Sequence, residues 1–426
     1  MGSPYKTFAV QSFGCKVNFA DTSFISQKLI KFGLSNVNDS EIADIYILNT
    51  CSVTENADKK ASKYIKMIHS KAPQSRIIVT GCYAQLQPEL IRDIDGVDLV
   101  IGMENKLDIE KYILNSDENI FRNNIKSTKK FNITYSLSER TRSFIKVQDG
   151  CNYSCTYCTI PNARGISRSD SIRETIKKIK SIVKTGIKEI VLSGINVGDF
   201  GINNENLYKL LLEIEKIDNL KRYRISSIEP NLLGDDIIEL LSNSSKALPH
   251  LHIPLQSGSD KILKDMKRRY NSKYYRDLIY KIKKMIPNIC IGVDVIVGFP
   301  SETMEDFMKT YDFLDELDIS YLHVFSYSER DNTEAAKIKK KIKSSDIKFR
   351  RTLLQKLSKE KNKKYINKNI NSVQSVLFEN HENGYSHGLT ENYIRVYVKS
   401  DNKYKNKIKR VKLIKDEGHI IGQFYE

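Results

Sequence analysis

The first hundred residues alternate short apolar runs with longer segments in which apolar residues recur at helical spacing. The runs at 7–13, 45–50 and 76–81 predict β-strands, and the segments 22–32, 56–70 and 89–94 predict the helices that follow them. Such an alternation is typical of a parallel sheet wound with helices. We therefore expect a doubly wound α/β domain over residues 1–112.

A second strand–helix series begins at residue 143. Its predicted strands are 143–149, 189–196, 223–229, 251–256, 292–298 and 322–328, and its predicted helices are 172–185, 207–217, 235–242, 262–267 and 305–317. Six such units predict a partial (βα)6 barrel over 143–336, laterally open in contrast to the closed eight-stranded form. Residues 113–142 are rich in Asn, Lys and Ser without sustained periodicity, so we expect a linker there.

The remainder of the chain divides into a lysine-rich helical stretch and a β-rich end. Residues 337–371 predict a connecting helix, whereas 372–426 alternate apolar and polar positions and predict a small β-barrel. Its expected strands are 375–379, 393–398, 410–414 and 419–423. Arg395, Lys409 and Arg410 are interleaved there with tyrosines, a pattern that suits a nucleic-acid backbone with stacked bases. A plain solvated β-surface is the alternative.

The charge balance favours a polyanionic partner. The chain has 69 Lys and Arg against 52 Asp and Glu, a net charge of +17. Nucleic acid is the partner that such an excess suggests, and a composition bias that merely solvates the surface is the alternative. No apolar run reaches 18 residues, so we expect no membrane span. An odd number of clustered cysteines without a secretory signal leads us to expect a reducing cytoplasm.

Six of the seven cysteines fall into two groups. Cys151, Cys155 and Cys158 share one loop with C-x3-C-x2-C spacing, and the next hundred residues contain no further cysteine. Three such thiolates can ligate three irons of a four-iron cluster and leave the fourth iron open to a substrate or cofactor. This vacancy indicates a site for chemistry rather than for electron transfer alone.

The other group, Cys15, Cys51 and Cys82, is spread along the first domain, each residue just after a predicted strand. Because the carboxyl ends of parallel strands lie along one edge of a sheet, we expect these cysteines to converge. A second cluster is favoured over three small buried residues. A zinc site built from the same six cysteines is the competing interpretation. Cys290 is expected in the core.

The sequence around these cysteines resembles the radical S-adenosylmethionine (SAM) methylthiotransferases. The loop reads Val-Gln-Asp-Gly-Cys-Asn-Tyr-Ser-Cys-Thr-Tyr-Cys over 147–158, and further similar motifs are Ala163-Arg-Gly, Ser226–Pro230, His252–Ser259 and Asp294–Pro300. The resemblance extends over nearly the whole chain. Gly14–Asn18 and Asp58–Lys60 look like the branch that acts on N6-threonylcarbamoyladenosine of tRNA, whereas Asn162 and Asp170 depart from that branch's usual residues.

The resemblance implies an activity, two cofactors and several partners. It implies two [4Fe-4S] clusters, one on Cys151, Cys155 and Cys158 that cleaves SAM, and an auxiliary one on Cys15, Cys51 and Cys82 that holds sulfur. The implied product carries a methylthio group at C2 of N6-threonylcarbamoyladenosine, at position 37 beside the anticodon. The implied partners are the tRNA anticodon stem-loop, an electron donor and a sulfur source. We expect a cytoplasmic monomer whose last domain is TRAM-like.

Two alternatives stay open. One is the same chemistry on isopentenyladenosine tRNA or on a ribosomal protein aspartate, since those branches usually carry other residues after the first cysteine. The other is a non-catalytic iron–sulfur protein that binds RNA or senses redox state. A protein of that kind would not need two open clusters on separate domains.

Weaker candidates lie at other strand ends and in basic segments. Ser193, Gly194, Glu229 and Gln256 are candidate contacts of SAM at the carboxyl edge of the barrel. Arg164 and Arg168 join Arg395, Lys409 and Arg410 as candidate RNA contacts. His250 and His252 are expected to pack within the barrel rather than to act as ligands.

Overall fold

A computed structural model describes residues 4–38, 41–52, 54–114, 119–137, 141–401, 404–416 and 419–425. The N-terminal unit is a six-stranded parallel sheet in the order β2-β1-β3-β4-β5-β6. Its strands are β1 (Thr7–Ser12), β2 (Ser35–Asn36), β3 (Ile45–Thr50), β4 (Arg76–Gly81), β5 (Leu99–Ile101) and β6 (Ile120–Phe121). The three predicted strands are confirmed, and three short ones extend the sheet.

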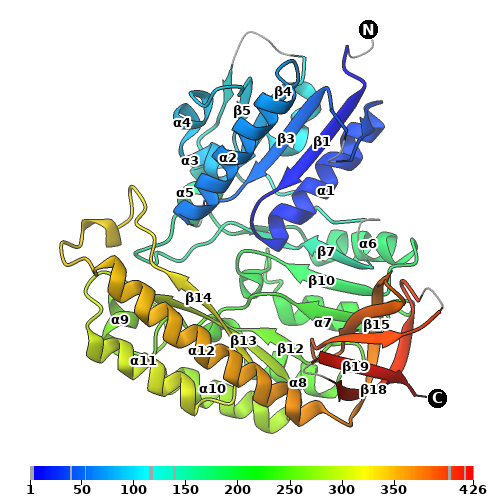
Figure 1. Cartoon of the computed structure of the whole chain (residues 1–426), viewed down its shortest axis with the longest axis vertical. Helices are drawn as coiled ribbons and strands as arrows, with labels where there is room; N and C mark the ends of the chain where they lie inside the picture. Colours follow the sequence, from blue (N-terminus) through cyan, green and yellow to red (C-terminus); the bar gives the residue numbers. More distant parts are fainter. Residues whose placement is uncertain are drawn as a thin grey trace.

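Helices cover both faces of this sheet (Figure 1). They are α1 (Lys16–Lys31), α2 (Glu55–Lys71), α3 (Cys82–Leu86) and α4 (Pro88–Arg92). Alternate residues of β3 point to opposite faces, so Ile47 packs with α1 and Leu48 with α2. The unit is thus doubly wound, as predicted. Helix α1 begins six residues before its predicted start because its first turns bury polar residues such as Asn18 and Asp21, which hide the apolar periodicity.

The central unit is an open barrel of six parallel strands. These are β7 (Arg142–Lys146), β10 (Glu189–Ser193), β11 (Arg222–Ile225), β12 (His250–His252), β13 (Cys290–Val297) and β14 (Tyr321–Ser326). They form two halves, β7-β10-β11 and β12-β13-β14, which the bridges Ser227–His252 and Tyr223–Ala247 join. The partial (βα)6 barrel is therefore confirmed.

The barrel helices follow the strands in order. They are α6 (Ile172–Val183), α7 (Leu207–Glu215), α8 (Asp235–Asn243), α9 (Asp260–Asp265), α10 (Ser272–Met285) and α11 (Met304–Glu316). Just after β7, the short strands β8 (Gln148–Asp149) and β9 (Arg168–Ser169) pair in antiparallel fashion. The loop with the C-x3-C-x2-C spacing and the short helix α5 (Ile160–Arg164) lie between them.

Two predicted connections differ in detail from the structure. Strand β6 falls within 113–142, so the sheet continues into the segment expected to be a linker, because a pair of apolar residues is too short to show periodicity. Residues 115–118 and 138–140 of that segment lie outside the described residues. The connecting helix α12 (Ser344–Asn369) begins seven residues after its predicted start and packs along β14 (Figure 1).

The C-terminal unit is a closed five-stranded barrel in the order β15-β16-β17-β19-β18. Its strands are β15 (Val373–Glu382), β16 (Tyr385–Thr390), β17 (Arg395–Lys399), β18 (Ile408–Asp416) and β19 (His419–Phe424). The sequence predicted four of them. Strand β16 was missed because its glycine and polar residues interrupt the apolar alternation.

Three arginines dock this small barrel against the central one. Arg222 and Arg224 are ion-paired with the buried Glu189 at 2.7 and 2.9 Å and donate to carbonyl oxygens at the end of β16. Arg142 pairs with Glu379 of β15 at 2.7 Å. Because these charges are buried and mutually compensated, the contact specifies how the two barrels sit together.

None of the helices in the described part of the chain has the length and apolarity needed to cross a membrane.

Candidate active site

Three cysteines from distant parts of the sequence meet at the carboxyl edge of the N-terminal sheet. Cys15 caps α1, Cys51 follows β3 and Cys82 begins α3. Gly14 has a φ of +113°, and a Cβ there would lie 2.5 Å from Cys51 Cβ, so glycine is required for this approach. Burial raises the pKa of the Cys82 thiol, an effect that Arg164 opposes.

The other three cysteines share the loop between β8 and α5. Gly150 begins it with a φ of +74°, and a Cβ there would lie 2.0 Å from the Ile166 carbonyl oxygen. Burial, together with charge on Cys155 and against the effect of a backbone N–H, raises the pKa of Cys158 to about 12 and that of Cys151 to about 11. A thiolate here therefore needs a positive partner, which iron would supply.

Each of the two groups offers three thiols, the number of protein ligands that a four-iron cluster with one open iron needs. A tetrahedral zinc ion holds thiolates at about 2.3 Å, so its ligand atoms lie roughly 4 Å apart. Among the described residues, the one group of three ligand atoms within 4.8 Å of one another is His252, Asp294 and His323, which contains no cysteine. Wider spacing is what three thiolates need when each binds a different iron. A structural zinc site closes its tetrahedron with four protein ligands, whereas each of these groups offers three cysteines.

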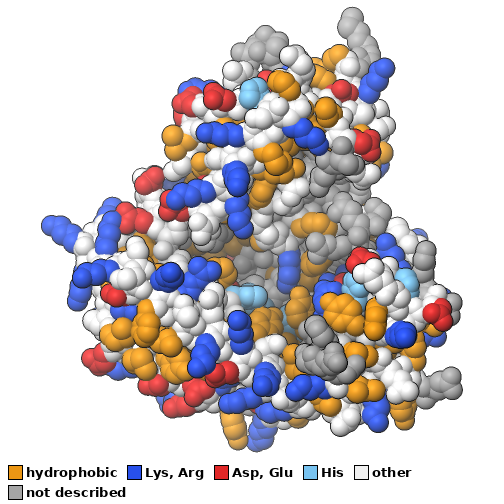
Figure 2. Space-filling model, in the orientation of Figure 1, with side chains coloured by type: hydrophobic (Ala, Val, Ile, Leu, Met, Phe, Trp, Pro, Cys, Tyr) orange, Lys and Arg blue, Asp and Glu red, His pale blue; other side chains and the backbone are white. Residues whose placement is uncertain are grey.

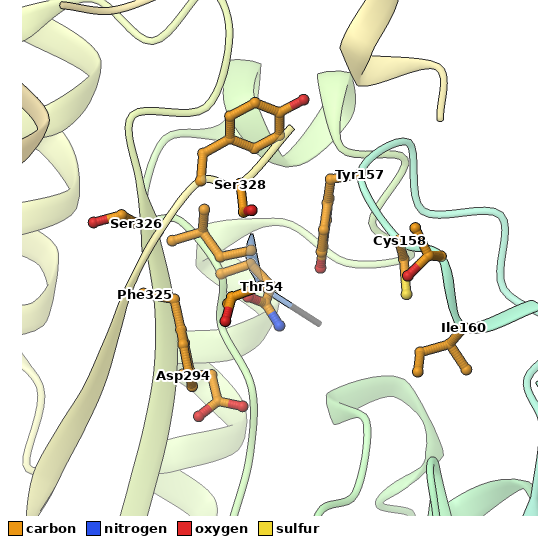
Figure 3. Close-up of a pocket in the computed structure, with 12 residues that line it drawn as sticks. Thr54, Tyr157, Cys158, Ile160, Asp294, Phe325, Ser326 and Ser328 are labelled. Carbon is orange, nitrogen blue, oxygen red and sulfur yellow. The ribbon is translucent and has the colours of Figure 1, made fainter. Parts of the chain in front are cut away.

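A cavity of about 180 Å³ lies beside the cysteine loop. Cys158 and Tyr157 line one side of it, and Asp294 and Phe325, from β13 and β14, line the other side (Figure 3). Gln256, a candidate SAM contact, also lines this cavity. The cavity therefore opens both to the cysteine loop and to the carboxyl ends of the barrel strands, where barrel chemistry takes place.

Glu229, another candidate SAM contact, reaches the cysteine loop through a residue that sequence reasoning missed. Arg268 forms an ion pair with Glu229 and donates a hydrogen bond to Cys155 Sγ at 3.0 Å. Burial raises the pKa of Glu229, and Arg268 opposes that effect. Arg268 follows α9 as one of 69 Lys and Arg residues, so nothing in its sequence context distinguishes it.

The remaining two SAM candidates lie behind the cavity rather than in its lining. Ser193 is fully buried and donates its hydroxyl to the Val191 carbonyl at 3.2 Å. Gly194 packs against Gln148, which in turn donates to the Gly150 carbonyl at 2.8 Å at the start of the cysteine loop. Gly194 thus contacts the start of the cysteine loop through Gln148.

The structure gives Arg164 partners other than the expected RNA. Its side chain is 1% exposed and donates to Cys82 Sγ at 3.3 Å, Asp149 at 2.8 Å and Asn18 at 2.5 Å. In this conformation it offers no surface to RNA and instead joins the two cysteine groups. Arg168 donates to carbonyl oxygens of its own loop, both at 2.8 Å, and so holds the backbone there.

The candidate RNA contacts of the last domain lie on the outside of the small barrel. The Arg395 side chain is 47% exposed, and Lys409 and Arg410 are exposed on β18. Tyr397 is exposed beside Arg395 on β17, and Arg410 lies over the ring of Tyr425 at 5.0 Å. Cations and aromatic rings therefore both lie on the outside of the small barrel, on β17 and near β18, and these are the side-chain types that proteins use to contact single-stranded nucleic acid.

The fold and the cysteine loop define a radical SAM enzyme. A model of the radical SAM superfamily matches residues 145–314, and a model described as uncharacterized protein family UPF0004 matches residues 7–102. The fold is similar to that of the radical SAM methyltransferase TsrM from Kitasatospora setae, with a TM-score of 0.57 and 13% identity over 78% of this chain and 77% of that one.

Sequence relatives define the family. The chain is 39% identical to the threonylcarbamoyladenosine tRNA methylthiotransferase MtaB of Bacillus subtilis, over 97% of this chain and 96% of that protein. It is 33% identical to a tRNA-2-methylthio-N(6)-dimethylallyladenosine synthase of Endomicrobium trichonymphae, over 97% and 100% of the two chains. The chain therefore belongs to the radical SAM tRNA methylthiotransferases, in the threonylcarbamoyladenosine subgroup, enzymes that use SAM and two [4Fe-4S] clusters.

Proposed function

We propose that this enzyme adds a methylthio group to C2 of N6-threonylcarbamoyladenosine at position 37 of tRNA, beside the anticodon. The observation that supports the proposal is the hydrogen bond by which the barrel unit reaches the cysteines of the N-terminal unit. Arg164, the last residue of the helix that follows the loop of Cys151, Cys155 and Cys158, donates to Cys82 Sγ of the other group at 3.3 Å. A reaction that needs a radical source and a sulfur carrier requires both sites at one substrate.

The residues of the chain divide into those that hold the cofactors and those that position the substrate. When bound, the cluster on the C-x3-C-x2-C loop supplies the electron that cleaves SAM to a radical able to remove the C2 hydrogen, and the auxiliary cluster supplies the methylated sulfur. Gln256 in the cavity lining and Glu229 beside Cys155 are our candidates for contacting SAM. The walls of the cavity shield the radical from water.

The small barrel supplies the surface for RNA. Arg395, Lys409 and Arg410 would contact phosphates and fix the register of the anticodon stem-loop without reading its sequence. The target adenosine has to leave its stack to reach the cavity, as bases do in other enzymes that modify them. An electron donor and a sulfur source complete the partners that the chemistry requires, and we propose that the enzyme acts as a monomer in the cytoplasm.

The product formed in vitro tests this proposal. Anaerobically reconstituted enzyme is incubated with SAM, a reductant and tRNA that carries threonylcarbamoyladenosine, and the nucleosides are separated and weighed by mass spectrometry. We expect the mass of that nucleoside to rise by one methylthio group in place of hydrogen. tRNA carrying dimethylallyladenosine is the parallel substrate, because a relative at 33% identity is named for it. Modification of that nucleoside alone would replace our proposal by the second substrate.

A further inference from the structure

Three polar side chains gather at the mouth of the barrel without a role in cluster binding. His252, Asp294 and His323 come from the adjacent strands β12, β13 and β14, and their ligand atoms lie within 4.8 Å of one another. His252 Nε2 is 2.7 Å from Asp294 Oδ1, and the rings of His252 and His323 meet edge to face at 5.4 Å. His252 is half-buried in polar contacts within the barrel, whereas His250 is buried against Tyr321.

A fourth side chain, Lys16, faces this group from the N-terminal unit. It directly follows Cys15 and is half-buried. Burial lowers the pKa of His323, charge on Asp294 opposes that effect, and charge on His252 and on Lys16 adds to it, so Lys16 lies close to this group. Burial and the charges of Arg142 and Arg224 lower the pKa of Lys16 itself to about 8, an effect that Asp294 opposes. The side chain of Lys16 has neither a hydrogen bond nor an ion pair to any of the described residues. Figure 2 shows this region as a hollow between the units, with basic and histidine side chains in it.

The charges around the hollow leave room for an anion. Lys16 lies near Arg142 and Arg224, which are already paired with Glu379 and Glu189. Asp294 is the acidic group that favours the Lys16 ammonium, and it is already bonded to His252. An unpaired, half-buried ammonium gains most from a carboxylate that also finds hydrogen-bond partners nearby.

We infer that Lys16, His252, Asp294 and His323 form the binding site for the threonylcarbamoyl group of the substrate, an inference that rests on the proposed function. Lys16 pairs with the carboxylate of that group. The imidazoles and Asp294 bind its hydroxyl and urea N–H groups. We name this set the acyl subsite.

The position of the acyl subsite agrees with the geometry of adenine. C2 and N6 lie on the same edge of the base, separated by N1. A base whose C2 faces the cavity therefore directs its N6 substituent to a neighbouring surface. Asp294 belongs to both the cavity lining and the acyl subsite, so the two are adjacent.

The same subsite discriminates against an apolar N6 substituent. A dimethylallyl group offers neither a carboxylate nor a hydroxyl, and on binding it would leave Lys16 and Asp294 desolvated without new partners. Sites built to hydrogen-bond a substrate group reject analogues that lack it far more strongly than apolar pockets reject a missing methylene. A divalent cation bound by His252, Asp294 and His323 is disfavoured because the Lys16 ammonium faces the same space.

The test compares two anticodon stem-loops that differ only in the N6 group, one with threonylcarbamoyladenosine and one with unmodified adenosine. Their affinities for the anaerobic holoenzyme are measured by fluorescence anisotropy. We expect Lys16→Met to reduce the preference for the modified RNA about tenfold, the size of a charge-assisted hydrogen bond, with little change for the unmodified RNA. Lys31→Met, at the exposed far end of the same helix, is the matched control and retains the preference. Iron and sulfide contents equal to those of the wild type exclude damage to the neighbouring cluster.

A second variant distinguishes the acyl subsite from a metal site and from failure of the proposed function. His323→Phe keeps the ring shape and should also weaken the preference. An unchanged preference in both variants overturns the acyl subsite, as does a wild-type enzyme that forms the product without preferring the modified RNA. A stoichiometric divalent metal that is lost in His323→Phe overturns it in favour of a metal site. Failure of the wild type to modify threonylcarbamoyladenosine at all refutes the proposed function instead.

Discussion

Replacing Arg164 by glutamine tests whether one side chain couples the two cysteine groups. Its guanidinium contacts Cys82 of the N-terminal unit and Asp149 of the barrel unit, and it is buried. Lys146, at 3.4 Å from Asp149, is the other cation bonded to that carboxylate in the described structure. Glutamine keeps part of the length and removes the charge.

The expected cost follows from burial. The Asp149 side chain is 6% exposed, and removing one partner of a buried ion pair costs about 3–5 kcal/mol. Loss of the N–H donor to Cys82 also changes the reduction potential of the auxiliary cluster, because that potential depends on hydrogen bonds to the cluster's sulfur ligands. If that bond is stronger by about 1.4 kcal/mol in the reduced state, the potential falls by about 60 mV in the variant.

The assay isolates the auxiliary cluster. Cys151, Cys155 and Cys158 are replaced by alanine so that the protein carries only the cluster on the other three cysteines. A redox titration followed by electron paramagnetic resonance then gives its potential with Arg164 and with Arg164→Gln. Anaerobic thermal unfolding of both proteins gives the loss of stability. Arg168→Gln is the matched control, because Arg168 lies four residues further along the chain and donates to carbonyl oxygens instead of sulfur.

An unchanged potential in Arg164→Gln at unchanged iron content would show that the Arg164 hydrogen bond does not tune the auxiliary cluster. The same conclusion follows if Arg168→Gln shifts the potential as much, because the effect then belongs to this segment as a whole. Arg164→Lys distinguishes charge from geometry. Lysine restores a positive charge beside Asp149 but cannot contact three partners, so stability should recover more than the potential does.

Two further variants test the separate roles of the two clusters and the role of the small barrel in tRNA binding. Cys82→Ala should abolish methylthio transfer while 5′-deoxyadenosine formation from SAM stays measurable, and loss of both in a folded protein would contradict separate roles for the two clusters. Arg395→Ala combined with Arg410→Ala should weaken tRNA binding. The slope of log binding constant against log salt concentration should become less steep by about 0.7 to 0.9 for each phosphate that the protein no longer neutralises. An unchanged slope would indicate that tRNA docks elsewhere.

The central strands of the two α/β units could be predicted because each buried parallel strand is a short apolar run. Strands β3 and β4 begin and end at the predicted residues. The start of α1 could not be predicted, because Asn18 and Asp21 are buried in polar contacts with other units and so break the apolar pattern. The short edge strand β6 gives too few residues for any periodicity.

The convergence of Cys15, Cys51 and Cys82 follows from topology alone, because parallel strands share one carboxyl edge. The roles of Arg164 and Arg268 do not follow from the sequence. Arg164 meets Cys82 across 82 positions, and both arginines look in the sequence like members of a large basic surplus. Only their burial beside cysteine sulfurs separates them from surface charges that contact RNA.

The three units meet around one hollow, and their contacts fix what can enter it. The small barrel is held against the central one through Arg222, Arg224 and Glu189, which fixes how the two barrels sit together. Arg164 likewise holds the N-terminal unit to the cysteine loop. If tRNA binds to the small barrel as we propose, an unstacked base of its loop would enter the cavity. Substrate choice then depends on the N6 group of that base, which the four side chains of the acyl subsite would read.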